Sequence, residues 1–305
     1  MAKLFPQVSS EFIWRRVHSL MGLWLVLYLI EHLLVNSQAA LWIGDDGIGF
    51  IRLVDLIQAL PYLQVVETLL IGVPLVLHAG WGVKRALEAR TNAGRGDGST
   101  PGLPSGRNRA FTWQRLSSWI LLFGILGHVV QMRFLDKPKE AQVETTRGYF
   151  SKVSMDDGLP TLAARLGVEV YDREKIGSFR ATDDPKGLVE LQKAEEERQW
   201  QEVLESYTLK ENQVITVSPN PGTAMLLMVR DTFKSPTFAV LYTIFVLAAA
   251  FHAFNGFWTF LITWGAILSY RSQRAMIPVS VIGMLFLSFF GLAAIWGSYW
   301  INLRH

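Results

Sequence analysis

The chain has 305 residues and a net charge of +3, and 50% of its residues are hydrophobic against 18% charged, which is the composition of a membrane protein. It contains no cysteine, which excludes disulfides, thiolate metal ligands, iron–sulfur clusters and cofactors attached through cysteine. The sequence pI is about 9.1. Basic residues at the ends of membrane helices account for this charge, so no nucleic-acid partner is predicted.

Five apolar runs are each long enough to cross a bilayer as a helix. Residues 1–11 lack the features of a cleavable signal peptide, so the first run is predicted to remain in the membrane. The five predicted helices cover about 13–36, 62–84, 111–134, 237–266 and 276–300.

The distribution of basic residues predicts the orientation, because cytoplasmic loops carry an excess of Lys and Arg. The segment 37–61 carries only Arg52 against three aspartates, whereas 84–115 is rich in Lys and Arg. The N-terminus and the 84–115 segment are therefore predicted inside, and the C-terminus outside. The Gly-, Pro- and Ser-rich stretch Asn92–Arg107 is predicted to be a flexible connection within an inner loop at 85–110.

A polar segment at 135–236 separates the third and fourth helices and lies outside in this topology. Leu188–Ser206 has the spacing of an amphipathic helix, and Met225–Phe233 is expected to lie along the membrane interface. We expect a small, partly disordered extracytoplasmic subdomain that acts as a cap. The predicted fold is an all-α membrane protein with helices I–III in 1–134, the insertion in 135–236 and helices IV–V in 237–305.

Four histidines fall one each on the first four predicted helices: His32, His78, His128 and His252. A rise of about 1.5 Å per residue and alternating helix directions place them at two levels separated by roughly 15 Å. His32 is paired with His128 near the outer face, and His78 with His252 near the inner face. Ionisable side chains inside a membrane are costly and need partners. His18 has no partner at its depth, so it is expected to serve the inner surface or a partner protein rather than iron.

Two pairs of facing imidazoles at two depths are what two bis-histidine haems require. A haem with both axial positions filled carries electrons and does not bind oxygen. The histidines could instead bond to backbone carbonyls or form a proton path, so a haem-free, proton-coupled membrane protein is the alternative.

The sequence also resembles a known family. The matching segments are FIWRRVHSLMG, LYLIEHLLVN, LVLHAGWGV, QRLSSWILLFGILGHVVQMRF and FHAFNGFWTFLITWGAILSYRSQR. Together they resemble the cytochrome b subunit of succinate dehydrogenase and fumarate reductase, in its five-helix, two-haem form that works with menaquinone.

The resemblance implies a subunit of a bacterial-type cytoplasmic membrane that anchors a flavoprotein and an iron–sulfur protein at the cytoplasmic face. It implies that electrons pass from the iron–sulfur protein through a proximal haem b, bound by His78 and His252, to a distal haem b, bound by His32 and His128, and then to menaquinone. The chain itself would perform no dicarboxylate chemistry. A quinol-oxidising cytochrome b of another dehydrogenase is a second interpretation.

Two departures from the family limit what is carried over. The 135–236 connection is much longer than usual. Ala250 occupies a position where some members have a glutamate for transmembrane proton transfer, so that pathway is not transferred to this chain.

Two acidic residues are candidates for quinone protonation. Glu67 precedes His78 by eleven residues, which is about 20° of rotation and about 16 Å of rise, so it shares the face of His78 at the level of the outer haem. A carboxyl there is suited to exchange quinone protons, although it could equally bond a neighbour at the membrane end. Glu31 points to a different face from its neighbour His32; it is the weaker candidate, because a neutral buried acid or a pair with Arg133 also explains it.

Cationic side chains are candidates for the haem propionates. Arg15 and Arg16 lie at the inner end, where positive-inside anchoring explains them almost as well. Arg133 lies at the outer end and is the stronger candidate for a propionate or quinone contact. Asn255, Trp258 and Thr259 lie on the inner side of His252, near the predicted proximal haem or the iron–sulfur partner.

Overall fold

The structure is a computed structural model that describes residues 9–88, 106–143, 146–178 and 187–305. The chain divides into two compact units. The helical unit comprises Met1–Leu34, Pro61–Gly127 and Tyr242–Leu292, and the sheet unit comprises Val35–Leu60, His128–Leu241 and Ala293–His305.

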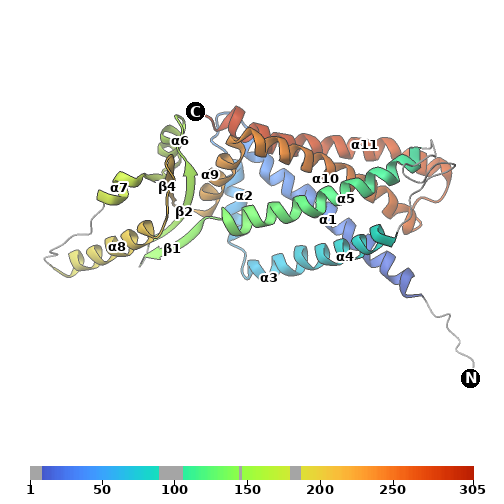
Figure 1. Cartoon of the computed structure of the whole chain (residues 1–305), viewed down its shortest axis with the longest axis horizontal. Helices are drawn as coiled ribbons and strands as arrows, with labels where there is room; N and C mark the ends of the chain where they lie inside the picture. Colours follow the sequence, from blue (N-terminus) through green and yellow to red (C-terminus); the bar gives the residue numbers. More distant parts are fainter. Residues whose placement is uncertain (1–8, 89–105, 144–145, 179–186) are drawn as a thin grey trace, which may run out of the picture. The chain divides into compact units, whose positions relative to one another are not determined.

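Five helices of the described chain are long and apolar enough to cross a membrane, as predicted. The first is α1 (Ser10–Leu41), and the second joins α3 (Leu63–Glu67), the π-helix η1 (Thr68–Gly72) and α4 (Val73–Glu88). The third joins α5 (Gly106–Val129) and η2 (Val130–Leu135). The fourth is α10 (Pro236–Thr263), and the fifth joins α11 (Tyr270–Leu292) and η3 (Ala293–Asn302). Figure 1 labels the helices that form these five spans as α1, α3, α4, α5, α10 and α11.

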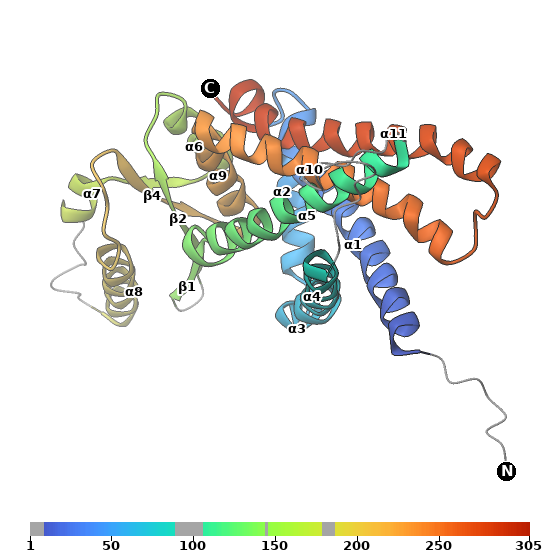
Figure 2. The same cartoon turned by 45° about the vertical axis from the view of Figure 1, so that its right-hand side comes forward.

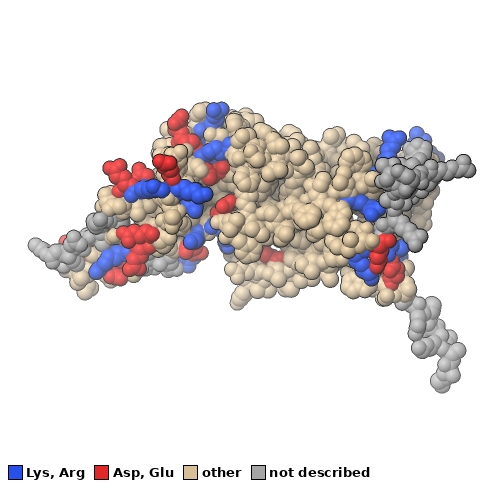
Figure 3. Space-filling model, viewed as in Figure 1, with Lys and Arg blue, Asp and Glu red and all other residues tan. Residues whose placement is uncertain are grey.

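The sides of these helices are apolar and exposed. Val76, Phe123 and Ile282 are each more than 60% exposed, and Figure 3 shows almost no charged side chain between the helix ends. Contiguous apolar surface of this extent is not left to water in a soluble protein. The chain is therefore a multi-pass membrane protein whose lipid-facing surface is formed by these residues.

Inside the helical unit, α1, α10 and α11 share a small hydrophobic core, which contains Val26, Leu33, Ala250, Ala253 and Leu287. Small residues at such positions let membrane helices approach closely. Ala250 is fully packed in this core, with 1% of its surface exposed.

Basic residues gather where α1 begins and α4 ends. Glu11 lies 3.1 Å from Arg85 and 3.5 Å from Arg15, and the guanidinium of Arg115 donates to the carbonyl of Ala86 at 3.3 Å. These contacts agree with helices that alternate in direction. Arg90, Arg95 and most of the predicted flexible connection Asn92–Arg107 lie outside the described residues.

The prediction of an all-α fold is wrong for the insertion, which contains a four-stranded antiparallel sheet in the order β1-β2-β4-β3. The strands are β1 (Lys139–Val143), β2 (Thr146–Ser154), β3 (Glu169–Tyr171) and β4 (Gln213–Ser218). In the register, Phe150 pairs with Val217 and Glu169 also pairs with Val217 from the other side. Strand β4 is buried from Val214 to Ser218. A short, continuously buried strand shows no period-two alternation, which is why the sequence pattern does not reveal it.

Helices cover both faces of the sheet. On one face, Trp200 of α8 (Leu188–Glu205) packs against Phe150 with ring centroids 5.0 Å apart and planes tilted by 42°, which confirms the predicted amphipathic helix. On the other face, the hydroxyl of Ser151 donates to the carbonyl of Ala224 in α9 (Pro221–Lys234) at 3.1 Å. The short helices α6 (Leu159–Leu166) and α7 (Arg173–Ser178) complete this unit, and both views show α9 beside β2 and β4 (Figure 2).

Helix α9 corrects the prediction that Met225–Phe233 lies along the membrane interface. Its residues are almost all buried, because the sheet covers one side while α2 (Ile48–Gln58) and η3 pack on the other. A Cβ on Gly222 would lie 2.4 Å from the carbonyl oxygen of Ile51, so only glycine allows α9 to approach α2 this closely. The amide of Gly222 donates to Asp55 at 2.7 Å, and Asn220 caps the helix by accepting from the amide of Thr223.

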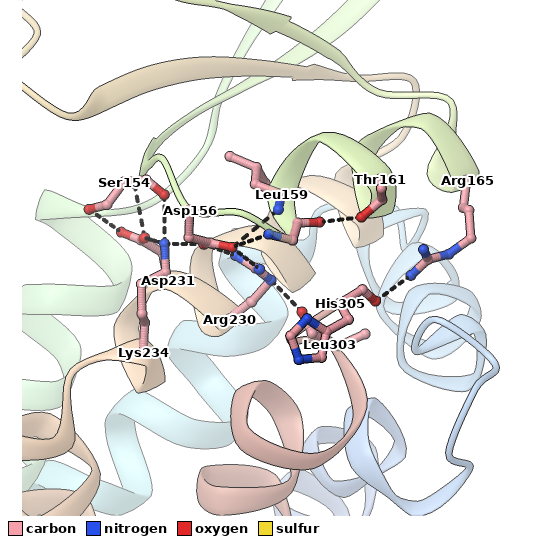
Figure 4. A network of polar contacts seen from close by, with 11 residues as sticks. Ser154, Asp156, Leu159, Thr161, Arg165, Arg230, Asp231, Lys234, Leu303 and His305 are labelled. Atoms are coloured by element: carbon pink, nitrogen blue, oxygen red, sulfur yellow. Dashed lines mark hydrogen bonds and ion pairs between the residues drawn. The ribbon is translucent and has the colours of Figure 1, made fainter.

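A cluster of charged groups joins α9 to the loop before α6 and to the C-terminal residues (Figure 4). Arg230, which is 1% exposed, donates to both carboxylate oxygens of Asp156 at 2.7 Å and to the carbonyl of Leu303 at 2.7 Å. Lys234 also contacts Asp156, at 2.5 Å. Burial alone would raise the pKa of Asp156, but the hydrogen bonds from Arg230 and Lys234 outweigh it and hold that pKa well below its usual range.

Candidate functional site

Two of the predicted intramembrane histidines meet inside the helical unit. The rings of His78 on α4 and His252 on α10 have centroids 6.2 Å apart and planes at 82°. A metal lies about 2 Å from each imidazole nitrogen that binds it, so two rings that share one ion have centroids roughly 6 Å apart. The observed centroid separation of 6.2 Å fits two imidazoles that would bind one iron ion from opposite sides.

His18 is a third member of this site, which corrects the prediction that it has no partner at its depth. Its ring stacks on that of His78 with centroids 4.1 Å apart and planes at 7°. The Nδ1 of each ring lies 3.0 Å from the backbone carbonyl oxygen of the other residue. A Cβ on Gly22 would lie 2.7 Å from the ring of His78, so this glycine makes room for the stack on α1.

The hydrogen bonds leave the same nitrogen open on both rings of the pair. The Nδ1 of His78 donates to the carbonyl of His18, because a carbonyl can only accept. The hydroxyl of Ser117 donates to the carbonyl of Gln114 at 3.0 Å, so its oxygen accepts from the Nδ1 of His252 at 3.3 Å. In each imidazole the Nε2 then carries the free lone pair, as metal-binding histidines require.

Sequence reasoning missed Gln114 and Ser117, which fix His252 from α5. The side-chain amide of Gln114 donates to the backbone carbonyl of His252 at 3.2 Å and accepts from Asn255 at 2.7 Å. A signal for them was present, because Ser117 precedes His128 by eleven residues and so shares its face of the helix. Polar residues on the interior face of a membrane helix mark functional positions.

One buried donor near this site lacks a partner among the described residues: the indole nitrogen of Trp258. A buried unsatisfied N–H is costly and calls for an acceptor. Trp258 lies one and two-thirds turns beyond His252 on α10, and a carboxylate such as a haem propionate would satisfy this donor.

The two histidines of the predicted outer pair, His32 and His128, belong to different units. His32 belongs to the helical unit, where its ring lies 5.5 Å from that of Tyr28, whereas His128 is the first residue of its segment in the sheet unit. Their pairing therefore stays a prediction. Two π-helical segments adjoin predicted site residues: η1 follows Glu67 directly, and η2 begins two residues after His128.

The remaining candidates are dispersed in the structure. Arg15 pairs with Glu11, and Arg16 lies over the ring of Phe12 at 3.6 Å. Glu31 is exposed on the surface of α1, so the alternative explanation of Glu31 as a neutral buried acid is wrong for this structure. Glu67 is half-buried. Arg133 lies in η2, and its proposed contact with a propionate or quinone stays a prediction.

No group of three or more His, Asp or Glu side chains that could hold a metal ion occurs in the described part of the chain. A haem iron needs only two protein ligands, since the macrocycle supplies the others. The fold and the site thus define a class of protein: a multi-pass helical membrane protein that presents facing imidazoles inside its bundle.

Comparison with known proteins narrows this class. The chain is 26% identical over 289 residues to the succinate dehydrogenase cytochrome b558 subunit of Bacillus subtilis (strain 168), covering 94% of this chain and 96% of that protein. It is therefore a distant homologue of that subunit along nearly its whole length. No protein-family model and no solved structure matches the chain.

Proposed function

We propose that this chain is the cytochrome b membrane anchor of a succinate dehydrogenase complex, with two haem b groups, working with menaquinone. The observation that carries the proposal is the separation of 6.2 Å between the rings of His78 and His252, together with the free Nε2 on each. The full-length similarity to a succinate dehydrogenase cytochrome b558 subunit supports the same class.

In this proposal His78 and His252 hold the inner haem, and His32 and His128 hold the outer one. Each haem would supply a one-electron carrier held by two histidines. The indole N–H of Trp258 would donate to a propionate oxygen at the inner site, and Arg15, Arg16 and Arg133 are the cationic candidates for the other propionates. An iron–sulfur subunit, itself joined to a flavoprotein subunit, binds at the inner end, and dicarboxylate chemistry belongs to those partners.

The test is a reduced-minus-oxidised visible spectrum of the complex purified from its native membrane. We expect a low-spin b-type band corresponding to two haems, and co-purification of a flavoprotein and an iron–sulfur protein. Absence of the band would favour the haem-free, proton-coupled alternative. The band without a succinate-oxidising partner would favour a quinol-oxidising subunit of another dehydrogenase.

The quinone site is proposed near Glu67. The π-helical turn η1 begins directly after this residue, and its carbonyl at Leu70 accepts from the indole of Trp24 at 2.6 Å. Such turns are frequent at functional sites because they free backbone groups from the regular helix. A half-buried carboxyl beside one is suited to give or take quinone protons.

Replacing Glu67 by Gln should lower the rate of quinone reduction by about 100-fold, the usual scale for losing a positioned acid–base group. Both haem bands should keep their intensities, since Glu67 lies a full helix segment away from His78. The rate is measured with succinate and a soluble menaquinone analogue, and Gln64→Glu on the same short helix serves as control. Unchanged turnover in the Gln variant would remove Glu67 from the site.

The proposed orientation places the N-terminus in the cytoplasm and the 135–236 insertion outside. The cluster of basic residues where α1 begins and α4 ends supports it. Because the chain lacks cysteine, single cysteines report the side directly. A membrane-impermeant thiol reagent should label Lys193→Cys in intact cells or spheroplasts, and Lys84→Cys only after permeabilisation. The reverse labelling pattern would invert the topology.

A further inference from the structure

A buried polar network joins α5 to α10 around His252. Ser117 is 4% exposed and Asn255 is 7% exposed. Ser117 accepts from the Nδ1 of His252 at 3.3 Å, Gln114 donates to the backbone carbonyl of His252 at 3.2 Å, and Asn255 donates to Gln114 at 2.7 Å. Gln114 and His252 are partly buried. In the apolar surroundings of a membrane helix bundle, polar groups are costly to bury unless their hydrogen bonds are satisfied.

The network controls two separate properties of His252. Gln114 holds helix α10 in place by donating to the backbone carbonyl of His252. Asn255, one turn further along α10, fixes the side-chain amide of Gln114 by donating to its oxygen. Ser117 contacts the imidazole ring of His252 itself, at Nδ1. Its hydroxyl proton is already donated to the carbonyl of Gln114 at 3.0 Å, so its oxygen can only accept from the imidazole. The ring is thereby held in the tautomer that presents Nε2.

We infer that Ser117 is a positioning residue for the inner haem, holding the His252 ring through its Nδ1 and setting the strength of that ring as an iron ligand. The inference rests on the proposed function. His78 is held differently, because its Nδ1 donates to the backbone carbonyl of His18, which no substitution removes. The two imidazoles of the inner pair therefore differ: a side-chain substitution can change the hydrogen bond at the Nδ1 of His252 but not the one at the Nδ1 of His78.

The direction of the effect follows from the charge on the ligand. A hydrogen bond from Nδ1–H to an oxygen increases the basicity of the imidazole, and a more basic ligand stabilises the oxidised, more positive iron. Hydrogen bonding in the outer shell is one of the levers by which a protein adjusts a haem potential. Without the Ser117 oxygen, the reduced state of the inner haem is favoured.

The test is a redox titration of the intact complex carrying Ser117→Ala, followed by the b-type absorbance. We expect the ratio of reduced to oxidised inner haem at a given ambient potential to rise up to tenfold, which is about 59 mV for a one-electron couple. The outer haem should titrate as in the unmodified complex. Ser117→Thr keeps a hydroxyl at the same place and should restore the original titration.

Ser118→Ala is the matched control. Ser118 has the same size, sits on the same helix and donates to the carbonyl of Arg115 at 2.7 Å, without a bond to His252. A purely structural role for the serines would move both alanine variants alike. If Ser117→Ala and Ser118→Ala both retain two haems and give the same redox titration, the inference is overturned and the proposed function stays intact. Absence of b-type haem from the unmodified complex overturns both.

Discussion

Replacing His252 by Ala is expected to remove one of the two haems and leave the other. The low-spin b-type absorbance should fall to about half, and electron transfer to quinone should stop, because His78, the other proposed ligand, would not hold the haem alone. His78→Ala should produce the same spectrum, since both side chains belong to one pair with ring centroids 6.2 Å apart. The measurement is the reduced-minus-oxidised spectrum, normalised to the amount of complex.

Two further histidines make this experiment specific. His305→Ala alters an exposed terminal residue and should retain both bands. His18→Ala removes a ring that stacks on His78 but keeps the backbone carbonyl to which His78 donates, so both haems are expected to remain. If His18→Ala lost a haem and His78→Ala kept both, His18 rather than His78 would be the haem ligand. Two intact bands in His252→Ala would show that the proposed pairing of His78 with His252 is wrong.

Replacing Asp156 by Asn should destabilise the sheet unit by about 3–5 kcal/mol, the usual cost of breaking a buried ion pair by removing one partner. The guanidinium of Arg230, only 1% exposed, would be left without its counter-ion. An amide oxygen of Asn could still accept from the amides of Gly158 and Leu159, which Asp156 caps at 3.0 and 3.1 Å. The substitution therefore keeps this cap and removes the negative charge together with the second acceptor oxygen, which contacts Arg230 and Lys234.

The measurement is the susceptibility of the sheet unit to protease in the full-length complex at increasing temperature. Glu140→Gln is the control, because the ion pair of Glu140 with Arg147 is 3.7 Å long and exposed, and such pairs contribute about 0–1 kcal/mol. Equal sensitivity of the two variants would mean that the buried pair contributes no more than a surface pair.

The same carboxylate predicts how the unit responds to acid. Because the pKa of Asp156 is depressed in the folded state, its contribution is fully present above the unfolded pKa of about 3.9 and is lost as the pH falls through the lower folded value. The unmodified unit should therefore resist protease down to mildly acidic pH, and Asp156→Asn should lose this part of the pH dependence.

Much of the helical unit follows from the sequence. Long apolar runs and the excess of Lys and Arg between them are local properties, and a bilayer of fixed thickness converts them into spanning helices. The regular rise of a helix then places His78 and His252 at one level without any knowledge of packing. The resemblance in five segments pointed to the same class of protein that the distant homologue supports.

The sheet was harder to predict for a physical reason. Strand β4 is buried on both faces between α8 and α9, so its pattern of side chains records burial but not alternation. For the same reason, the run Met225–Phe233 resembled an interfacial helix, since its apolar residues do not reveal whether lipid or protein covers them.

By itself, the sequence determined the class of protein, the five spanning helices and the common level of His78 and His252, because length, hydropathy and helical rise act along the chain. Only the tertiary structure decided which groups face one another. It placed His18 on His78, put the oxygen of Ser117 at the Nδ1 of His252, and buried Arg230 against Asp156. Contacts of this kind depend on the rotation and close approach of separate elements, which no local pattern in the chain encodes.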